Sequence, residues 1–317
     1  MNNRLFFIKL LFLFLCQVSL AQQTILTDSN LPIMVILTDI DPDTNIPYDI
    51  PDEPKVLATM KLIYRPDGTR NYLTDITNDT FLNYNGRIGI ELRGSSSQVL
   101  EKKPYGFTTL LEDDESNNNV NLLGMPSEND WVLNSLAYDP SMVRDYLSYT
   151  LSSNMGNYAP RVKYIEVIVN DDYKGVYILT EKIKRDSDRV NLKKIADFDN
   201  TAPEVTGGYI VKADKINGDD EVAWTMPNSG GWETNFLHHY PKTEDITGQQ
   251  ADYIENIFYD LATQTNPANT SISDGYPSII DIPSFVDYMI MAEFASNPDA
   301  YQFSTYFHKD RAGKLRA

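Results

Sequence analysis

Cysteine and histidine are scarce in this chain of 317 residues, which contains one cysteine and three histidines. The single cysteine, Cys16, lies in an apolar N-terminal segment, so the rest of the chain has no thiol for catalysis or for a disulfide. No H-E-x-x-H occurs, and we expect His238-His239 to be a packed strand segment rather than a zinc site. Gly94 belongs to no G-x-G-x-x-G or G-K-[ST] loop, which excludes an ordinary P-loop or dinucleotide-binding fold.

Basic residues are few relative to acidic ones: 27 Lys and Arg stand against 45 Asp and Glu, a formal net charge of −18. A surface this acidic argues against nucleic acid or an anionic membrane as the main partner. It suits a cation-rich protein partner or a metal-bound nucleotide. Solubility outside the cell explains the charge equally well.

The N-terminus has the order of a cleaved export signal. Arg4 and Lys9 precede the apolar run Leu10–Leu15, and Ser19-Leu20-Ala21 supplies the small residues of a cleavage site. The run is short for a membrane anchor, which is the alternative. We therefore predict a signal peptide at 1–21, a mature chain with no stable membrane span, and a secreted or cell-envelope location.

The remaining pattern predicts an α+β fold, with a β-rich N-terminal layer at 22–85 and a larger domain at 86–317. In R-P-D-G-T-R at 65–70, Pro, Asp and Gly favour a tight turn within a hairpin. N-D-D-Y-K-G at 170–175 predicts another hairpin. The expected strands include 33–38, 56–64, 162–169, 175–179 and 207–211, and the expected helices are one opened by Asp139-Pro140, one at 253–261 and one at 285–295.

One motif contains residues suited to phosphate. I-E-L-R-G-S-S-S-Q-V-L-E-K-K-P-Y-G-F at 90–107 places Arg93, Gly94 and a lysine pair between two expected strands. Arginine offers a planar fork of donors, lysine a compact cation, and glycine lets the backbone approach a ligand. Of the pair we prefer Lys103, because it sits directly before the P-Y-G-F strand. Adjacent strand residues point to opposite faces, so only one of the two lysines can face a site. A solvated strand edge is the alternative.

Further segments follow in a characteristic order: L-L-G-M-P-S-E-N-D-W-V-L at 122–133, D-P-S-M-V-R-D-Y-L at 139–147, V-I-V-N-D-D-Y-K-G-V-Y-I-L-T-E-K-I at 167–183 and A-E-F-A-S-N-P-D-A-Y-Q-F-S-T-Y-F-H-K-D at 292–310. Together with the first motif they resemble the CotH family, the spore-coat-protein-H-like atypical secreted protein kinases. The resemblance implies a kinase-like fold that binds ATP with Mg²⁺ or Mn²⁺. It also implies phosphorylation of Ser or Thr in an exported protein. The alternative is a catalytically silent adhesion or interaction module on the same fold.

The resemblance also implies roles for particular residues. Arg93, Lys103 and Glu181 would bind the nucleotide, Glu181 by orienting a lysine, although Glu181 paired with a neighbouring surface lysine is the alternative. Asp299 takes the place of the catalytic carboxylate and would also contact the metal. The family has Asn five residues later, where this chain has Ser304, and its W-D-x-D-like motif is not reached by Ala317. We therefore expect a C-terminally incomplete domain.

A further family position, Arg144, is equally well explained by a helix-surface salt bridge with Asp139 or Asp145. We interpret Arg144 as structural.

Overall fold

The structure is a computed structural model that describes residues 25–218, 220–228, 230–265 and 268–317. The signal peptide predicted at 1–21 lies outside the described residues. Within these ranges, no helix combines the length and the apolar character needed to cross a membrane.

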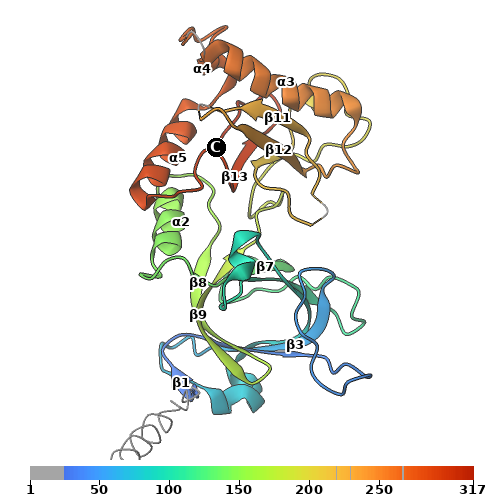
Figure 1. Cartoon of the computed structure of the whole chain (residues 1–317), viewed down its shortest axis with the longest axis vertical. Coiled ribbons are helices and arrows are strands. Elements are labelled where there is room, and N and C mark those ends of the chain that lie inside the picture. Colours follow the sequence, from blue (N-terminus) through green and yellow to red (C-terminus); the bar gives the residue numbers. More distant parts are fainter. Residues whose placement is uncertain (1–24, 219, 229, 266–267) are drawn as a thin grey trace, which may run out of the picture.

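The first half of the described chain forms a closed β-barrel (Figure 1). Six antiparallel strand pairs are completed by one parallel pair, in which Ile33 lies opposite Glu166. Alternating side chains of these strands fill the interior, including the fully buried Met34, Phe107 and Trp131. In barrel order the strands are β2 (Ile33–Thr38), β3 (Val56–Ile63), β5 (Leu82–Leu92), β6 (Tyr105–Leu110), β7 (Asp130–Asn134), β9 (Asp172–Glu181) and β8 (Val162–Val169).

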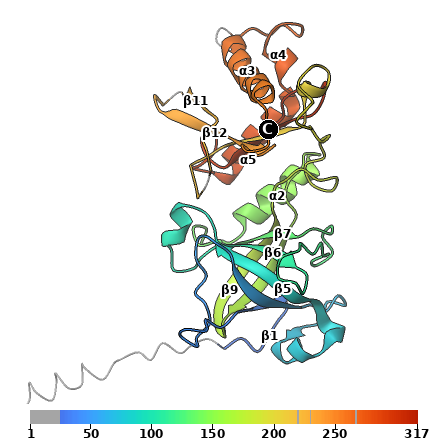
Figure 2. The ribbon, with the colours of Figure 1, turned by 90° about the vertical axis from the view of Figure 1, so that its right-hand side faces the viewer.

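The second half forms an antiparallel sheet of four strands, in the order β11 (Trp224–Pro227), β12 (Glu233–Tyr240), β10 (Tyr209–Ala213) and β13 (Thr305–Lys309). The β11–β12 hairpin projects from this half of the molecule (Figure 2). Aromatic rings join the sheet to its helices: the Trp224 and Phe236 ring centroids are 5.2 Å apart, and Phe258 lies 5.0 Å from Phe236. The helices are α3 (Gly248–Thr265), α4 (Tyr276–Ile279) and α5 (Ile282–Ala295).

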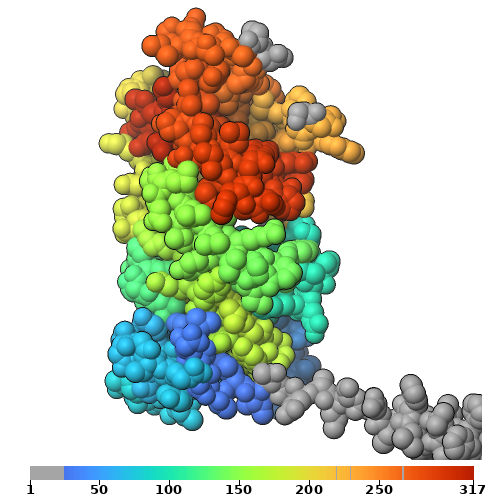
Figure 3. Space-filling view, turned by 90° about the vertical axis from the view of Figure 1, so that its left-hand side faces the viewer, coloured from blue at the N-terminus to red at the C-terminus, as the bar shows by residue number. Residues whose placement is uncertain are grey.

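Helix α2 (Arg144–Asn154) connects the two halves, because it follows β7 of the barrel and packs against α5. In the space-filling view its green atoms lie between the barrel and the red atoms of α5 (Figure 3). The short elements are β1 (Asp28–Ser29), β4 (Asn71–Tyr72) and the 3-10 helices η1 (Leu73–Thr77), η2 (Asp79–Phe81), η3 (Ser96–Val99) and η4 (Glu204–Thr206).

Several predicted elements are confirmed, and the mixture of helices and sheets is the α+β composition expected. The strand predicted at 33–38 has those bounds. The N-D-D-Y-K-G hairpin turns at Asn170 and Asp171, whose φ angles of 49° and 61° are those that a two-residue hairpin turn requires. Helix α5 is capped by Asp281, whose side chain accepts the Ser284 N–H.

Three expectations are corrected. The hairpin predicted around 65–70 was wrong: the turn forms, but β3 pairs with β2 and β5, while β4 pairs with β1. The boundary placed after residue 85 falls inside β5, because β2 and β3 belong to the same barrel as the later strands. The helix expected from Asp139-Pro140 begins only at Arg144.

Asp139 nevertheless caps that helix with its side chain. Its Oδ2 atom accepts hydrogen bonds from the Val143 and Arg144 N–H groups at 3.0 and 2.9 Å. Arg144 Nε lies 3.7 Å from Asp139 Oδ1, which is one of the two salt bridges anticipated for this arginine. The aspartate therefore caps the helix from a preceding turn.

Candidate functional site

A cleft of about 1500 Å³ lies between the barrel and the C-terminal sheet. The barrel contributes the residues after β5 and β9, and the C-terminal half contributes the end of β10 and the segment between α5 and β13. Helix α2 supplies part of the wall. The cleft is thus formed by segments far apart in the sequence.

Cationic side chains gather in this cleft. Arg93, Lys182, Lys212 and Lys242 all line it. Burial lowers the pKa of Lys182, and Asp130 opposes that shift, while Arg93 and Lys242 lower the pKa further. In the described part of the chain, only Lys212 of these four has an ion pair, with Asp220 at 2.6 Å. Cations that repel one another favour the binding of an anion with several charges, and here the charge of Lys182 is offset only in part by Asp130.

Lys182 reaches the cleft because of its position in the strand. Glu181, the last residue of β9, points into the protein, so the next side chain points to the other side. The Lys182 side chain is accessible to water, yet protein surrounds it on the walls of the cleft, which accounts for its lowered pKa. Its backbone is fixed by Arg189, whose Nη1 atom donates to Lys182 O at 2.6 Å.

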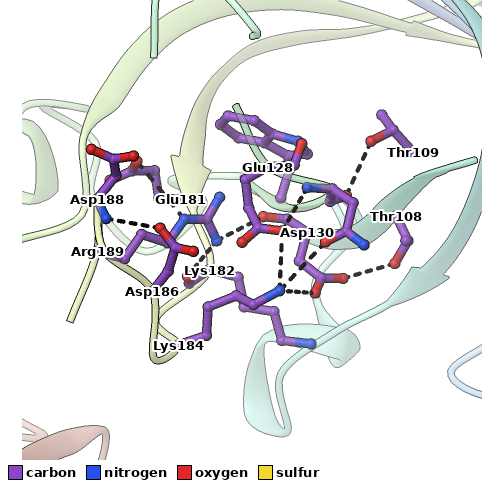
Figure 4. A network of polar contacts seen from close by, with 12 residues as sticks. Thr108, Thr109, Glu128, Asp130, Glu181, Lys182, Lys184, Asp186, Asp188 and Arg189 are labelled. Carbon is purple, nitrogen blue, oxygen red and sulfur yellow. Dashed lines mark hydrogen bonds and ion pairs between the residues drawn. The ribbon is translucent and has the colours of Figure 1, made fainter. Parts of the chain in front are cut away.

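A polar network supports this strand end (Figure 4). Lys184 Nζ contacts Glu128 Oε1 at 3.0 Å and Asp130 Oδ2 at 3.1 Å. Arg189 Nη1 also donates to Asp130 O at 3.1 Å, which joins β7 to the residues after β9. The network holds Lys184 on the barrel and leaves Lys182 directed at the cleft.

Glu181 is completely buried, but its partner is not the predicted lysine. Arg161 donates to it twice, from Nη1 at 2.6 Å and from the backbone N at 2.9 Å. Arg189 Nε lies 3.9 Å away and is itself almost fully buried. The lysine partner expected from the resemblance is therefore replaced by two arginines, which also hold the segment that carries Lys182.

Lys103 lies elsewhere. Although it belongs to the described range 25–218, it is not among the residues that line the cleft, and its Nζ donates to Gln98 O at 2.6 Å. Its backbone carbonyl accepts from the Tyr177 hydroxyl at 2.9 Å. Arg93, by contrast, lines the cleft and is exposed. Sequence reasoning missed Lys182; the signal was its place directly after a buried strand-end carboxylate.

Asp299 lines the same cleft as Arg93, in the loop after α5. The loop is fixed by its backbone: Asp299 N donates to Asn297 Oδ1 at 3.1 Å, and Phe303 N donates to Asp299 O at 2.8 Å. Ser304, with φ of 51°, donates its N–H to Asp214 Oδ1 at 3.2 Å. The Asp299 carboxylate itself is exposed.

The cleft is lined by carboxylates, Asp299 among them, as well as by cations. Across the described ranges, no group of three or more His, Cys, Asp or Glu side chains is arranged to hold a metal. Magnesium that arrives with a nucleotide needs only one or two carboxylates beside the phosphate oxygens. Asp299 is available for such a contact.

His238 and His239, on β12, also line the cleft. His239 Nε2 lies 2.7 Å from Ile183 O, which ties β12 to the segment after β9. Burial lowers the pKa of His239 to about 4, so the ring is neutral near pH 7. The packed strand predicted for His238-His239 is part of β12.

Comparison with known proteins adds one finding. The model of the family described as CotH kinase protein matches residues 90–317, more than half of the chain. No curated protein matches the chain.

Proposed function

This chain belongs to the CotH kinase protein family, and we propose that it transfers the γ-phosphate of ATP to serine or threonine side chains of an exported protein. The observation that carries the proposal is the group of cations in the cleft, where Arg93, Lys182 and Lys242 have no ion pair among the described residues. A triphosphate supplies the matching charge. Phosphoryl transfer depends mainly on such positioning and charge neutralisation.

The residues divide into distinct roles. Arg93 and Lys182 hold phosphate oxygens from the barrel side, and Lys212 and Lys242 do so from the sheet side. Glu181 acts through Arg161 and Arg189, which fix the strand end that carries Lys182. A divalent cation, Mg²⁺ or Mn²⁺, supplies further neutralisation when bound with ATP, and Asp299 would contact it.

The proposed transfer forms one bond to the γ-phosphorus and breaks another. The hydroxyl oxygen of the acceptor forms a bond to the γ-phosphorus, and the bond from that phosphorus to the bridging oxygen of ADP breaks. The hydroxyl proton passes to the Asp299 carboxylate, an exposed acceptor in the cleft. ADP then leaves with the negative charge of the broken bond.

We propose an exported location because of the N-terminal signal pattern, which also sets the class of substrate as an exported protein. The mature protein should begin near Gln22. N-terminal sequencing of the protein recovered outside the cytoplasm tests this. An intact Met1 on a membrane-bound product would show an anchor instead.

Transfer of label from γ-labelled ATP tests the activity, with the protein itself and a Ser-rich basic protein as acceptors and Mg²⁺ or Mn²⁺ present. We expect Asp299→Ala to lose at least about 100-fold in rate, as general base catalysis contributes that much. Asp274→Ala, at an exposed aspartate that does not line the cleft in the described structure, should match the wild type. Equal labelling by the wild type and Asp299→Ala would refute the role of Asp299.

A silent binding module is the competing function. It is favoured by Ser304, which stands where the family has Asn, and by the acidic net charge of −18. Binding of ATP without transfer to any acceptor, with either metal, would support the module. Transfer that Asp299→Ala abolishes would exclude it.

A further inference from the structure

The loop that carries Asp299, residues 296–304 between α5 and β13, has an unfavourable backbone conformation. Ser296, Tyr301 and Ser304 have φ angles of 50°, 69° and 51°, in the left-handed region that residues other than glycine rarely adopt. Such conformations persist only where surrounding contacts impose them, and they concentrate at functional sites. The contacts that impose this shape therefore determine how the loop presents Asp299 to the cleft.

One side chain of α5 holds this loop. The Tyr288 hydroxyl accepts a hydrogen bond from the Tyr301 backbone N at 2.9 Å, and it lies 2.8 Å from Thr305 Oγ1 in β13. Thr305 Oγ1 donates its hydrogen to Phe303 O at 3.1 Å, so the Tyr288 hydroxyl must be the donor in the bond between the two hydroxyls. The Tyr288 ring also packs edge-on against the Tyr301 ring, with the centroids 5.6 Å apart.

These hydrogen bonds form one chain beside Asp299. The chain runs from the Tyr301 N–H through the two hydroxyls to Phe303 O, so each hydroxyl both donates and accepts. Phe303 then donates its backbone N–H to Asp299 O at 2.8 Å. Tyr288 lines the cleft from the middle of α5, and Thr305 is buried at the start of β13. A single hydroxyl of the helix is thus bonded to the loop and to the strand that follows it.

We infer that Tyr288 is a positioning residue, whose hydroxyl fixes the loop so that the Asp299 carboxylate lies where the acceptor hydroxyl reacts. The inference rests on the proposed function, in which Asp299 takes the proton of that hydroxyl. Because the carboxylate is exposed, the backbone that carries it decides where it lies. Displacement of a reacting group by about 1 Å can lower the rate about 100-fold.

Tyr288→Phe tests the inference, because it keeps the ring and removes only the hydroxyl. Hydrogen exchange of the Tyr301 amide, which loses its acceptor, is the first measurement. We expect this amide to exchange about 10-fold faster in Tyr288→Phe than in the wild type. Tyr259→Phe, which removes the hydroxyl of an exposed tyrosine on α3, should leave the exchange unchanged. Equal exchange in the wild type and Tyr288→Phe would overturn the inference.

Steady-state transfer from γ-labelled ATP is the second measurement, because it separates kcat from KM. We expect Tyr288→Phe to lower kcat about 10-fold or more and to leave the KM for ATP unchanged, while Tyr259→Phe matches the wild type. In the Asp299→Ala background, Tyr288→Phe should lower kcat no further, because Tyr288 acts through Asp299. An equal loss of kcat in both backgrounds, or a change in KM alone, would overturn the inference.

The two measurements also separate this inference from the proposed function. A wild type that transfers no phosphate would refute the proposed function. Exchange of the Tyr301 amide would still decide whether the Tyr288 hydroxyl holds the loop.

Discussion

Glu181→Ala provides the strongest test of how the candidate site is held together. The side chain of Glu181 is completely buried, and Arg189 beside it is 1% exposed, whereas Arg161 is 44% exposed and can turn to water. Removing one partner of a buried ion pair costs about 3 to 5 kcal/mol, because the other charge stays buried and uncompensated. Since Arg161 can relax, we expect the lower end, about 3 kcal/mol.

Urea unfolding followed by tryptophan fluorescence measures this loss, with Trp131 as a probe because its ring lies 5.3 Å from the Arg189 guanidinium. Asp172→Ala is the matched control at the other end of β9, where the aspartate pairs with Lys174 on the surface. Exposed pairs contribute less than about 1 kcal/mol. If both variants lost the same stability, the buried network would not hold the strand end as described.

Two further predictions concern pH and backbone conformation. His308 has its pKa lowered to about 4, by burial first and then by Arg316, so the unfolded chain takes up a proton more readily. The free energy of unfolding should fall as the pH drops from about 6.5 towards 4. Measured by urea unfolding, the loss between pH 7 and pH 4.5 should be about 2 kcal/mol smaller in His308→Gln than in the wild type. A parallel pH dependence in the variant would contradict the assignment. Asp171→Val should lower the stability by about 1 kcal/mol, since φ of 61° disfavours a β-branched side chain, while Asp171→Gly should not lower it.

Local patterns in the sequence were sufficient for individual elements. The run Ile33–Thr38 and the hairpin turn at Asn170-Asp171 depend on neighbouring residues only, and both agree with the structure. The closure of the barrel was not predictable in this way. It depends on the parallel pairing of β2 with β8, which are neighbours in the barrel but have most of its other strands between them in the sequence. No local signal specifies so distant a partner.

The candidate site was also predictable only in part. Arg93 and Asp299 were identified from motifs, and the structure places both in one cleft. Lys103 was selected because it directly precedes the P-Y-G-F strand and because alternation lets only one of the two lysines face a site, but its Nζ donates to Gln98 O instead. Lys182 follows the same alternation rule from Glu181, and recognising it required knowing that Glu181 is buried between arginines.

The central claim is that the cleft cations bind a triphosphate, and calorimetry with ATP and Mg²⁺ tests it most directly. Lys182→Met removes one of the three cleft cations that have no ion pair among the described residues. Lys174→Met changes a lysine within β9, the strand that ends before Lys182, and this lysine is paired with Asp172. We predict that Lys182→Met weakens binding about 10-fold or more, equivalent to about 1.4 kcal/mol, and that Lys174→Met binds like the wild type. Equal affinities for all three proteins would contradict the account.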